Sequence, residues 1–311
     1  MVITICIPQL ILSDMRSKIG KVTLNYDYYS GTDSCPDPEL ENRLLEIVKS
    51  GNDIEAILLN DNEGKILYNL SDMRKNLLSW YPIDKAASVL EIGSECGALT
   101  GLFCEKAGHV VAVEPSKTRS EINAYRNDFD NLEIVVGCLN NIKLEERFDC
   151  VTLVGALDRA DCLVAGDEPQ KQLLRLAIDL LNPDGVLVVA TSNKYGLKYW
   201  SGATEIDTET IFEESRGKAS ITPMSRTGLI RTLAEAGIET QDFYYPVPDY
   251  KLPLYIYTDG TLPDSEIINA ETVEYTQENL KLFNERKVSD ELLKDGMYAD
   301  FANSFLVIGR K

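Results

Sequence analysis

The sequence predicts a doubly wound α/β fold: seven mostly parallel strands in one sheet, an N-terminal helical cover and a C-terminal insertion. Two observations support this prediction. From Ala87 onward, short apolar strands alternate with amphipathic helices, which indicates parallel strands joined by right-handed crossovers. The strands are also continuously apolar rather than alternating, as expected when helices cover both faces of a sheet. The 311 residues are 44% hydrophobic and 26% charged, an ordinary globular balance.

Residues 1–84 are expected to form the helical cover, and residues 85–311 the α/β domain. Within the cover, Asp37-Pro38 opens a helix with proline at its first position, and apolar residues follow at helical spacing. Ser71 is expected to cap a second helix, which stops near Pro82. The residues before Asp37 show no regular pattern.

The α/β domain follows in order along the chain. Helices are expected through Ala107, over about 118–127 and 169–181, and from a cap at Ser225 to Gly237. A turn is expected at 182–185, just before the fifth strand. The expected strands are Ser88–Ile92, Val110–Val113, Leu132–Val136, Cys150–Val154, Val186–Thr191, Ile238–Tyr245 and Ser304–Ile308.

The segment 246–300 is an insertion rich in Pro, Tyr and Asp, with a helix expected near Thr276–Arg286. Such segments often build a lid or a substrate wall over the carboxyl edge of the sheet. Plain packing on the surface is an equally good interpretation.

Charge and composition exclude several functions. The chain has 31 Lys and Arg against 50 Asp and Glu, a net charge of −19, which argues against a nucleic-acid partner. A single histidine, His109, and seven scattered cysteines give no metal site and no Ser-His or Cys-His nucleophile. The apolar first twelve residues are too few to span a bilayer and lack the features of a signal peptide. We therefore expect a cytoplasmic protein without membrane insertion; the sequence gives no indication of its oligomeric state.

The strongest functional signal is the segment Val89–Gly101, VLEIGSECGALTG. The first strand ends at Ile92, and the chain turns at Gly93 into a helix expected to start near Gly97. A side chain at either glycine would keep a ligand away from the backbone there. Glu114 ends the second strand, 23 residues after Glu91, where a carboxylate can accept both ribose hydroxyls of a nucleoside.

These residues resemble the class I S-adenosylmethionine-dependent methyltransferases. The first family motif, acidic-x-Gly-x-Gly-x-Gly, is matched by Glu91, Gly93 and Gly97, and the second by Glu114. The resemblance covers about 85–245 and the last strand. Three further segments resemble a bacterial branch often found beside glycan-assembly enzymes: NLSDMR (69–74), NKYGLKYWSGA (193–203) and YYPVPDYKLP (244–253).

The resemblance implies a Rossmann-like fold and metal-free methyl transfer from S-adenosylmethionine, leaving S-adenosylhomocysteine, to a small-molecule or glycan-related acceptor. It places Glu91 beneath the loop, Glu114 on the ribose, Leu139 on the adenine face and Asn140 on the exocyclic amine. The implied cofactor contacts are Glu91, Gly93, Ser94, Glu95, Gly97, Glu114, Pro115, Leu139 and Asn140.

One position departs from the family motif. The middle glycine is replaced by Glu95, between Ser94 and Cys96. Its carboxylate would repel the carboxylate of the ligand, hold the ligand's ammonium group, or point to solvent.

The acceptor side of the site is expected after the fourth and fifth strands. Asp158, in the segment 155–159, is a candidate base facing the acceptor, or else a loop cap or an ion-pair partner of Arg159. Tyr195, Tyr199 and Trp200 bring aromatic rings to the same edge. They suit stacking on a sugar or ring acceptor, and packing of a hydrophobic lid is an equal alternative.

Two other functions share this topology. An NAD-dependent oxidoreductase needs glycines where this chain has Glu95 and Ala98. A non-catalytic scaffold that keeps the fold, with or without S-adenosylmethionine or a nucleotide bound, is favoured by Glu95.

Overall fold

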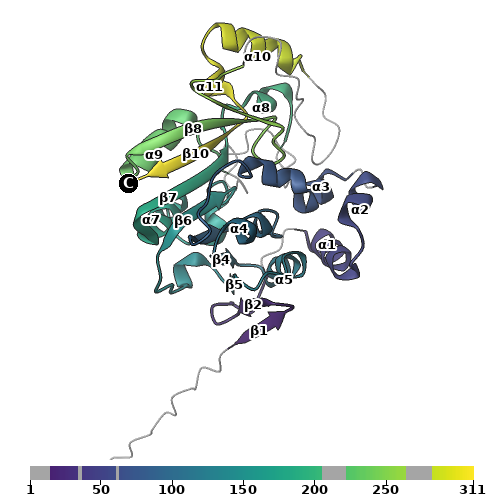
Figure 1. Ribbon diagram of the computed structural model, residues 1–311. Coiled ribbons are helices and arrows are strands. Elements are labelled where there is room, and N and C mark those ends of the chain that lie inside the picture. The colour runs from purple at the N-terminus through teal and green to yellow at the C-terminus, as the bar shows by residue number, and fades with distance from the viewer. Residues whose placement is uncertain (1–14, 34–36, 61–62, 205–221, 264–281) are drawn as a thin grey trace, which may run out of the picture.

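The structure is a computed structural model, which describes residues 15–33, 37–60, 63–204, 222–263 and 282–311 (Figure 1). Its strands are β1 (Arg16–Ile19), β2 (Val22–Asn25), β3 (Ser88–Ile92), β4 (His109–Glu114), β5 (Leu132–Val136), β6 (Phe148–Val154), β7 (Leu181–Ser192), β8 (Thr240–Val247), β9 (Tyr255–Thr258) and β10 (Ser304–Arg310).

The helices include two short 3₁₀ segments, η1 and η2. They are α1 (Pro38–Ser50), α2 (Ile54–Asn60), α3 (Gly64–Leu70), η1 (Asp72–Leu77), α4 (Thr100–Lys106), α5 (Lys117–Arg126), η2 (Leu139–Asn141), α6 (Ala160–Leu163), α7 (Pro169–Asp179), α8 (Leu197–Ser201), α9 (Arg226–Glu235), α10 (Glu285–Lys294) and α11 (Tyr298–Phe301).

All the described strands form one sheet, in the order β1-β2-β5-β4-β3-β6-β7-β10-β8-β9. The prediction of seven strands was therefore wrong: the described residues alone form ten strands of this sheet. The seven expected strands form its middle, from β5 to β8, and are parallel except for β10, which runs antiparallel to β7 and β8. The extra strands add to the edges, β1 and β2 beyond β5, and β9 beyond β8.

The order of the strands reverses at the centre of the sheet. From β3 the chain moves outward to β4 and β5, then returns across β3 to form β6 and β7. The strand order therefore reverses between β3 and β6. In doubly wound sheets, ligands bind at the carboxyl ends of the strands beside such a reversal.

Helices cover both faces of the sheet (Figure 1). On one face Leu90 and Ile92 pack into a core with residues of α7 and α9. On the other face Val89 packs with residues of α4 and α5. Neighbouring residues of one strand thus enter opposite cores, which explains why the central strands are apolar at every position.

The described part of residues 1–84, predicted to form a helical cover, contains the helix expected after Asp37 and two further helices, α2 and α3, that were not expected. Asp37 Oδ1 accepts a hydrogen bond from Leu40 N at 3.1 Å and caps α1. Ser71 Oγ accepts one from Met73 N at 3.2 Å, as expected, but the segment after it forms the 3₁₀ helix η1. The cover also supplies the strands β1 and β2, which the sequence did not predict.

Several boundaries differ from the prediction. Helix α4 begins at Thr100 rather than near Gly97, and β7 begins at Leu181, so the expected turn at 182–185 lies within the strand. Most of the helix expected at 276–286 falls outside the described residues. Within the part of the chain that the structure describes, no helix is long and apolar enough to cross a bilayer.

Candidate functional site

The turn after β3 lies at the reversal point of the sheet. Gly93 N and Ser94 N donate hydrogen bonds to Val113 O at 2.9 and 3.2 Å, which ties the turn to the end of β4. Gly93 has φ +73°, and a Cβ there would lie 3.2 Å from the Cβ of Ala156, just after β6. The turn thus sits between the carboxyl ends of β4 and β6.

Gly97 packs closely against α5, and its expected role in ligand approach stays a prediction. It has φ +75°, and a Cβ there would lie 2.3 Å from Asn123 Oδ1 in α5. Asn127 Nδ2 donates a hydrogen bond to Gly97 O at 2.9 Å. The side that a side chain would fill is therefore occupied by α5.

Glu91 lies beneath the turn and accepts a hydrogen bond from a residue of α4. Thr100 Oγ1 donates a hydrogen bond to Glu91 Oε2 at 2.5 Å, and Asn123 Nδ2 donates one to Thr100 Oγ1 at 3.0 Å. Glu91 is buried, and this burial raises the pKa of its carboxyl to about 8. The base of the turn is therefore a polar network shared by β3, α4 and α5.

Glu114 lies at the tip of β4 and bonds the turn directly. Its Oε2 accepts a hydrogen bond from Glu95 N, and its Oε1 accepts one from Ser116 N, both at 3.0 Å. Burial raises the pKa of Glu114 to about 7, although the Arg119 guanidinium opposes the shift. The carboxylate expected at the ribose is thus fixed in orientation by main-chain donors.

Glu95 is directed toward the N-terminal cover. Its φ is +48°, in the left-handed region that favours glycine. Tyr68 OH donates a hydrogen bond to Glu95 Oε2 at 2.7 Å, and Arg74 Nη1 lies 3.8 Å from the same oxygen. Burial by itself would raise the pKa of Glu95, but Arg159 and Arg74 outweigh that effect and lower it. Its negative charge is therefore balanced by neighbouring cations.

The exit of β5, where the adenine is expected, is covered by the segment after β2. A Cβ on Gly137 would lie 2.7 Å from Tyr28 O. Leu139 is buried in the core, so its side chain does not present an open face for a base. Asn140 is exposed, and its Nδ2 donates a hydrogen bond to Asn141 Oδ1 at 3.1 Å.

The same N-terminal segment reaches the start of α5. Asp33 Oδ1 accepts a hydrogen bond from Lys117 N at 2.8 Å, and its Oδ2 accepts one from Thr118 N at 3.0 Å. Pro115 is half-buried just before these residues. The cover therefore contacts the carboxyl ends of both β4 and β5.

Asp158 is buried, and its expected role as a base facing the acceptor stays a prediction. Its Oδ1 accepts a hydrogen bond from the Thr191 hydroxyl. Its Oδ2 accepts bonds from Ser192 N at 2.9 Å and Tyr250 OH at 3.3 Å. The carboxylate therefore fixes the end of β7 and the Tyr250 hydroxyl.

Tyr250 belongs to the segment YYPVPDYKLP (244–253), which the sequence analysis named without assigning this residue a role. A Cβ on Gly155, the residue after β6, would lie 3.0 Å from Tyr250 OH. Gly155 precedes Ala156, which contacts the Gly93 turn. The Tyr250 hydroxyl therefore lies at the carboxyl end of β6.

The three aromatic residues expected to form one platform differ in exposure. Tyr199 is only 7% exposed, whereas Tyr195 is 46% and Trp200 48% exposed. Tyr199 therefore belongs to the packed interior around α8. Only Tyr195 and Trp200 offer rings at the surface.

The three segments that carry the finer resemblance meet at this edge of the sheet. Asn76, just after NLSDMR, donates its Nδ2 hydrogen to Pro253 O at 3.1 Å. Lys198 Nζ lies 3.4 Å from Asp249 Oδ2, and both side chains are buried. Arg74 approaches Glu95 as described above. The three segments contain the polar residues Arg74, Lys198 and Asp249, which the analysis of the glycine motif did not assign to the site.

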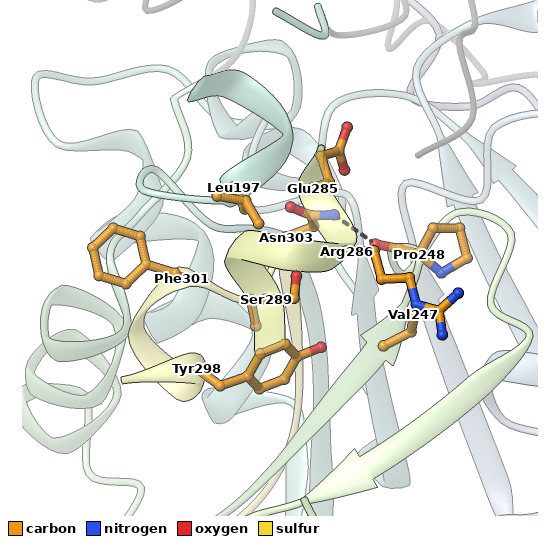
Figure 2. Close-up of a pocket in the computed structure, with 10 residues that line it drawn as sticks. Leu197, Val247, Pro248, Glu285, Arg286, Ser289, Tyr298, Phe301 and Asn303 are labelled. Carbon is orange, nitrogen blue, oxygen red and sulfur yellow. Dashed lines mark hydrogen bonds between the residues drawn. The ribbon is translucent and has the colours of Figure 1, made fainter. Parts of the chain in front are cut away.

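A pocket lies beside this edge, under α10 and α11 (Figure 2). Asn303 Nδ2 donates a hydrogen bond to Pro248 O at 2.9 Å across its wall. Helices α8, α10 and α11 and the end of β8 supply its lining. The lining residues are Leu197, Val247, Pro248, Glu285, Arg286, Ser289, Tyr298, Phe301, Ala302 and Asn303.

No protein-family model matches the chain, and no curated protein matches its sequence. Solved structures resemble it in fold. A SAM-dependent methyltransferase from Thermotoga maritima is 16% identical, with 89% of this chain and 97% of that chain covered and a TM-score of 0.48. A TehB-like SAM-dependent methyltransferase from Corynebacterium glutamicum is 13% identical, with coverages of 88% and 96% and a TM-score of 0.43.

A third structure is phosphoethanolamine N-methyltransferase 1 of Haemonchus contortus, in complex with phosphoethanolamine and S-adenosylhomocysteine. It is 17% identical, with 68% of this chain and 45% of that chain covered and a TM-score of 0.46. All three are likenesses of fold alone.

Proposed function

We propose that the chain is an S-adenosylmethionine-dependent methyltransferase. One arrangement carries this proposal: the Gly93 turn lies at the reversal point of the sheet, and the Glu114 carboxylate at the tip of the next strand accepts a hydrogen bond from Glu95 N in that turn. A backbone turn beside a fixed carboxylate suits a nucleoside with a substituent at its 5′ position.

The polar groups of the site fit this cofactor. Each oxygen of Glu114 accepts one main-chain hydrogen bond, and a carboxylate oxygen has two acceptor sites, so capacity remains for ribose hydroxyls. Glu91 supports the turn from below. Ser94 and Pro115 flank the nucleoside position, and exposed Asn140 is the expected contact of the base edge.

When bound, S-adenosylmethionine supplies an electrophilic methyl group on a sulfonium. The protein's own part is to align the acceptor with that methyl group and to exclude water. Asp158 acts as a positioning residue, because its carboxylate holds the Tyr250 hydroxyl at the end of β6. With its proton directed to Asp158, the Tyr250 oxygen offers lone pairs that can accept a hydrogen bond from an acceptor's O–H or N–H.

The acceptor is proposed to be a small molecule or a glycan-related compound. The support is the exposed rings of Tyr195 and Trp200. We further propose that residues 1–84 form a cover and that 246–300 form a wall over the acceptor side.

Calorimetry with S-adenosylmethionine and S-adenosylhomocysteine tests the proposal. Both are expected to bind, and Glu114→Ala is expected to weaken both by ~1–3 kcal/mol through lost charge-assisted hydrogen bonds. Glu105→Ala, an exposed glutamate of α4, is the matched control and should bind as the wild type does. An unchanged dissociation constant in Glu114→Ala would remove Glu114 from the site.

The second candidate is a scaffold that keeps the fold without catalysis. The specific observation in its favour is Tyr28, whose main chain lies against Gly137 at the expected adenine position. Failure of the wild type to bind either adenosyl compound would support the scaffold and end the methyltransferase proposal.

A further inference from the structure

Asp33, which follows β2 in the N-terminal segment, occupies the hydrogen-bond donors at the start of α5. Its Oδ1 accepts from Lys117 N at 2.8 Å, and its Oδ2 accepts from Thr118 N and Thr118 Oγ1, both at 3.0 Å. Tyr29 OH donates a further hydrogen bond to Oδ1 at 2.9 Å. Burial by itself would raise the pKa of Asp33, but these hydrogen bonds outweigh it and lower the pKa. The side chain is therefore an anion fixed at the first turn of the helix.

Ser116 joins this anion to the carboxylate proposed for the ribose. Its main-chain N–H donates a hydrogen bond to Glu114 Oε1 at 3.0 Å, and its hydroxyl donates one to Asp33 Oδ2 at 3.3 Å. Ser116 is buried, so both of these bonds lie inside the protein. The two carboxylates thus contact the same residue, Glu114 from the tip of β4 and Asp33 from the N-terminal segment.

The segment that carries Asp33 is fixed to the sheet at two other places. Asn25 Nδ2, at the end of β2, donates a hydrogen bond to Glu133 Oε1 in β5 at 3.3 Å. Tyr28 OH donates one to Lys143 O, beyond η2, also at 3.3 Å. The position of Asp33 is therefore set by the path of the whole segment as well as by its own bonds to α5.

The donors that Asp33 occupies are of the kind that binds phosphate. The main-chain N–H groups of a helix's first turn, together with the helix dipole, favour an anion. In doubly wound folds, side chains at the tip of the second parallel strand decide whether a ribose with a 2′-phosphate is accepted. Here Lys117 N and Thr118 N both donate to Asp33, and Lys117 Nζ lies 3.8 Å from Glu121 Oε1. A phosphate would meet a negative charge at this place.

We propose that Asp33 determines the specificity of the nucleoside site. Because its carboxylate occupies the start of α5, the site accepts an adenosyl ligand with free ribose hydroxyls and rejects a nucleotide phosphorylated on the 2′- or 3′-oxygen. The selection is electrostatic, since a phosphate on the ribose would lie beside both Glu114 and Asp33. This assignment rests on the proposed function and adds to it a recognition role for a residue of the N-terminal segment.

Adenosine and two of its monophosphates test the assignment by calorimetry on the full-length protein. Adenosine 2′-monophosphate places the phosphate on the ribose, whereas adenosine 5′-monophosphate carries the same phosphate at the other end and reports the general repulsion by the net charge of −19. In the wild type, the Kd of the 2′-monophosphate should exceed that of adenosine by about tenfold or more. Asp33→Asn removes the charge and should reduce this ratio about tenfold. The Kd values of adenosine and the 5′-monophosphate should stay within about twofold, which also shows that the variant is folded.

The matched control is Asp27→Asn, which removes an exposed carboxylate of the same segment that accepts a hydrogen bond from Met15 N at 3.0 Å. Its ratio should equal that of the wild type. A ratio that Asp33→Asn leaves unchanged, or that both variants reduce equally, would overturn the assignment while leaving the nucleoside site in place. Equal Kd values for adenosine and its 2′-monophosphate in the wild type would overturn it as well. If the wild type binds neither adenosine nor S-adenosylhomocysteine, the proposed function itself fails.

Discussion

At the scale of single residues, the turn after β3 is built mainly by its neighbours. Gly97 illustrates this, because its φ of +75° and the contact with Asn123 both exclude a side chain. Asn127 then fastens the carbonyl of Gly97 to α5. Gly97 is therefore explained by the packing of α5 against the turn. The glycine pattern in the sequence does not by itself separate this role from that of leaving room for a ligand.

We expect Gly97→Ala to destabilise the fold by about 1–3 kcal/mol. The added Cβ would lie 2.3 Å from Asn123 Oδ1, and alanine is strained at a positive φ. Urea unfolding followed by circular dichroism measures this loss. Gly237→Ala is the control, since it also has a positive φ but a Cβ there would meet nothing within 4 Å. A smaller loss at Gly97 than at Gly237 would contradict the packing role.

At the scale of elements, the cover is attached to the domain by charge as well as by apolar contact. Glu41 of α1 and Arg119 of α5 form a hydrogen-bonded pair at 2.6 Å, with side chains 5% and 19% exposed. Arg126 of α5 donates to Asn69 O and Leu70 O at the end of α3. Helix α5 therefore contacts both the cover and the turn.

Removal of the carboxylate of Glu41 should loosen the cover. Glu41→Gln leaves the guanidinium of Arg119 without its short ionic partner, and breaking a buried pair in this way costs about 3 kcal/mol. Hydrogen exchange should show faster exchange in α1 while the amides of β3 and β4 keep their protection. Glu39→Gln, on the exposed side of the same helix, is the control. Uniform loss of protection across the sheet would show that the cover and domain unfold together.

At the scale of the whole molecule, the sequence predicted the central sheet well because the central strands are buried on both faces and read as apolar runs. It missed β1 and β2 because the residues RSKI and VTLN carry no such run, and β2 becomes a strand by pairing with β5. It missed the surroundings of Asp158 and Tyr199 because burial at a strand exit depends on distant segments such as the one that holds Tyr250. The boundary at residue 84 stays a prediction.

The stability of the molecule should decrease as the pH rises from about 4.5 to about 8. Burial raises the pKa of Glu114 from 4.5 to about 7 and that of Glu91 from 4.5 to about 8. The folded state therefore holds more protons than the unfolded state in this range, so stability falls with rising pH. Across this range the free energy of unfolding falls by up to about 3 kcal/mol through Glu114 and up to about 5 kcal/mol through Glu91.

Urea unfolding at a series of pH values checks this slope. Glu91→Gln should flatten it between pH 5 and pH 8, since the amide oxygen can still accept from Thr100 without bearing a charge. Glu105→Gln on the surface of α4 should leave the slope unchanged. A slope that Glu91→Gln does not alter would show that Glu91 titrates normally in the folded protein.

The pairing of β2 with β5 also bears on how the protein is made. Asn25 and Glu133, hydrogen-bonded across these strands, are 108 residues apart in the chain. At a translation rate of roughly 5–20 residues per second, the first hairpin waits about 5–20 s on the ribosome before its partner strand emerges. Nascent chains must therefore keep β1 and β2 from pairing elsewhere during that delay.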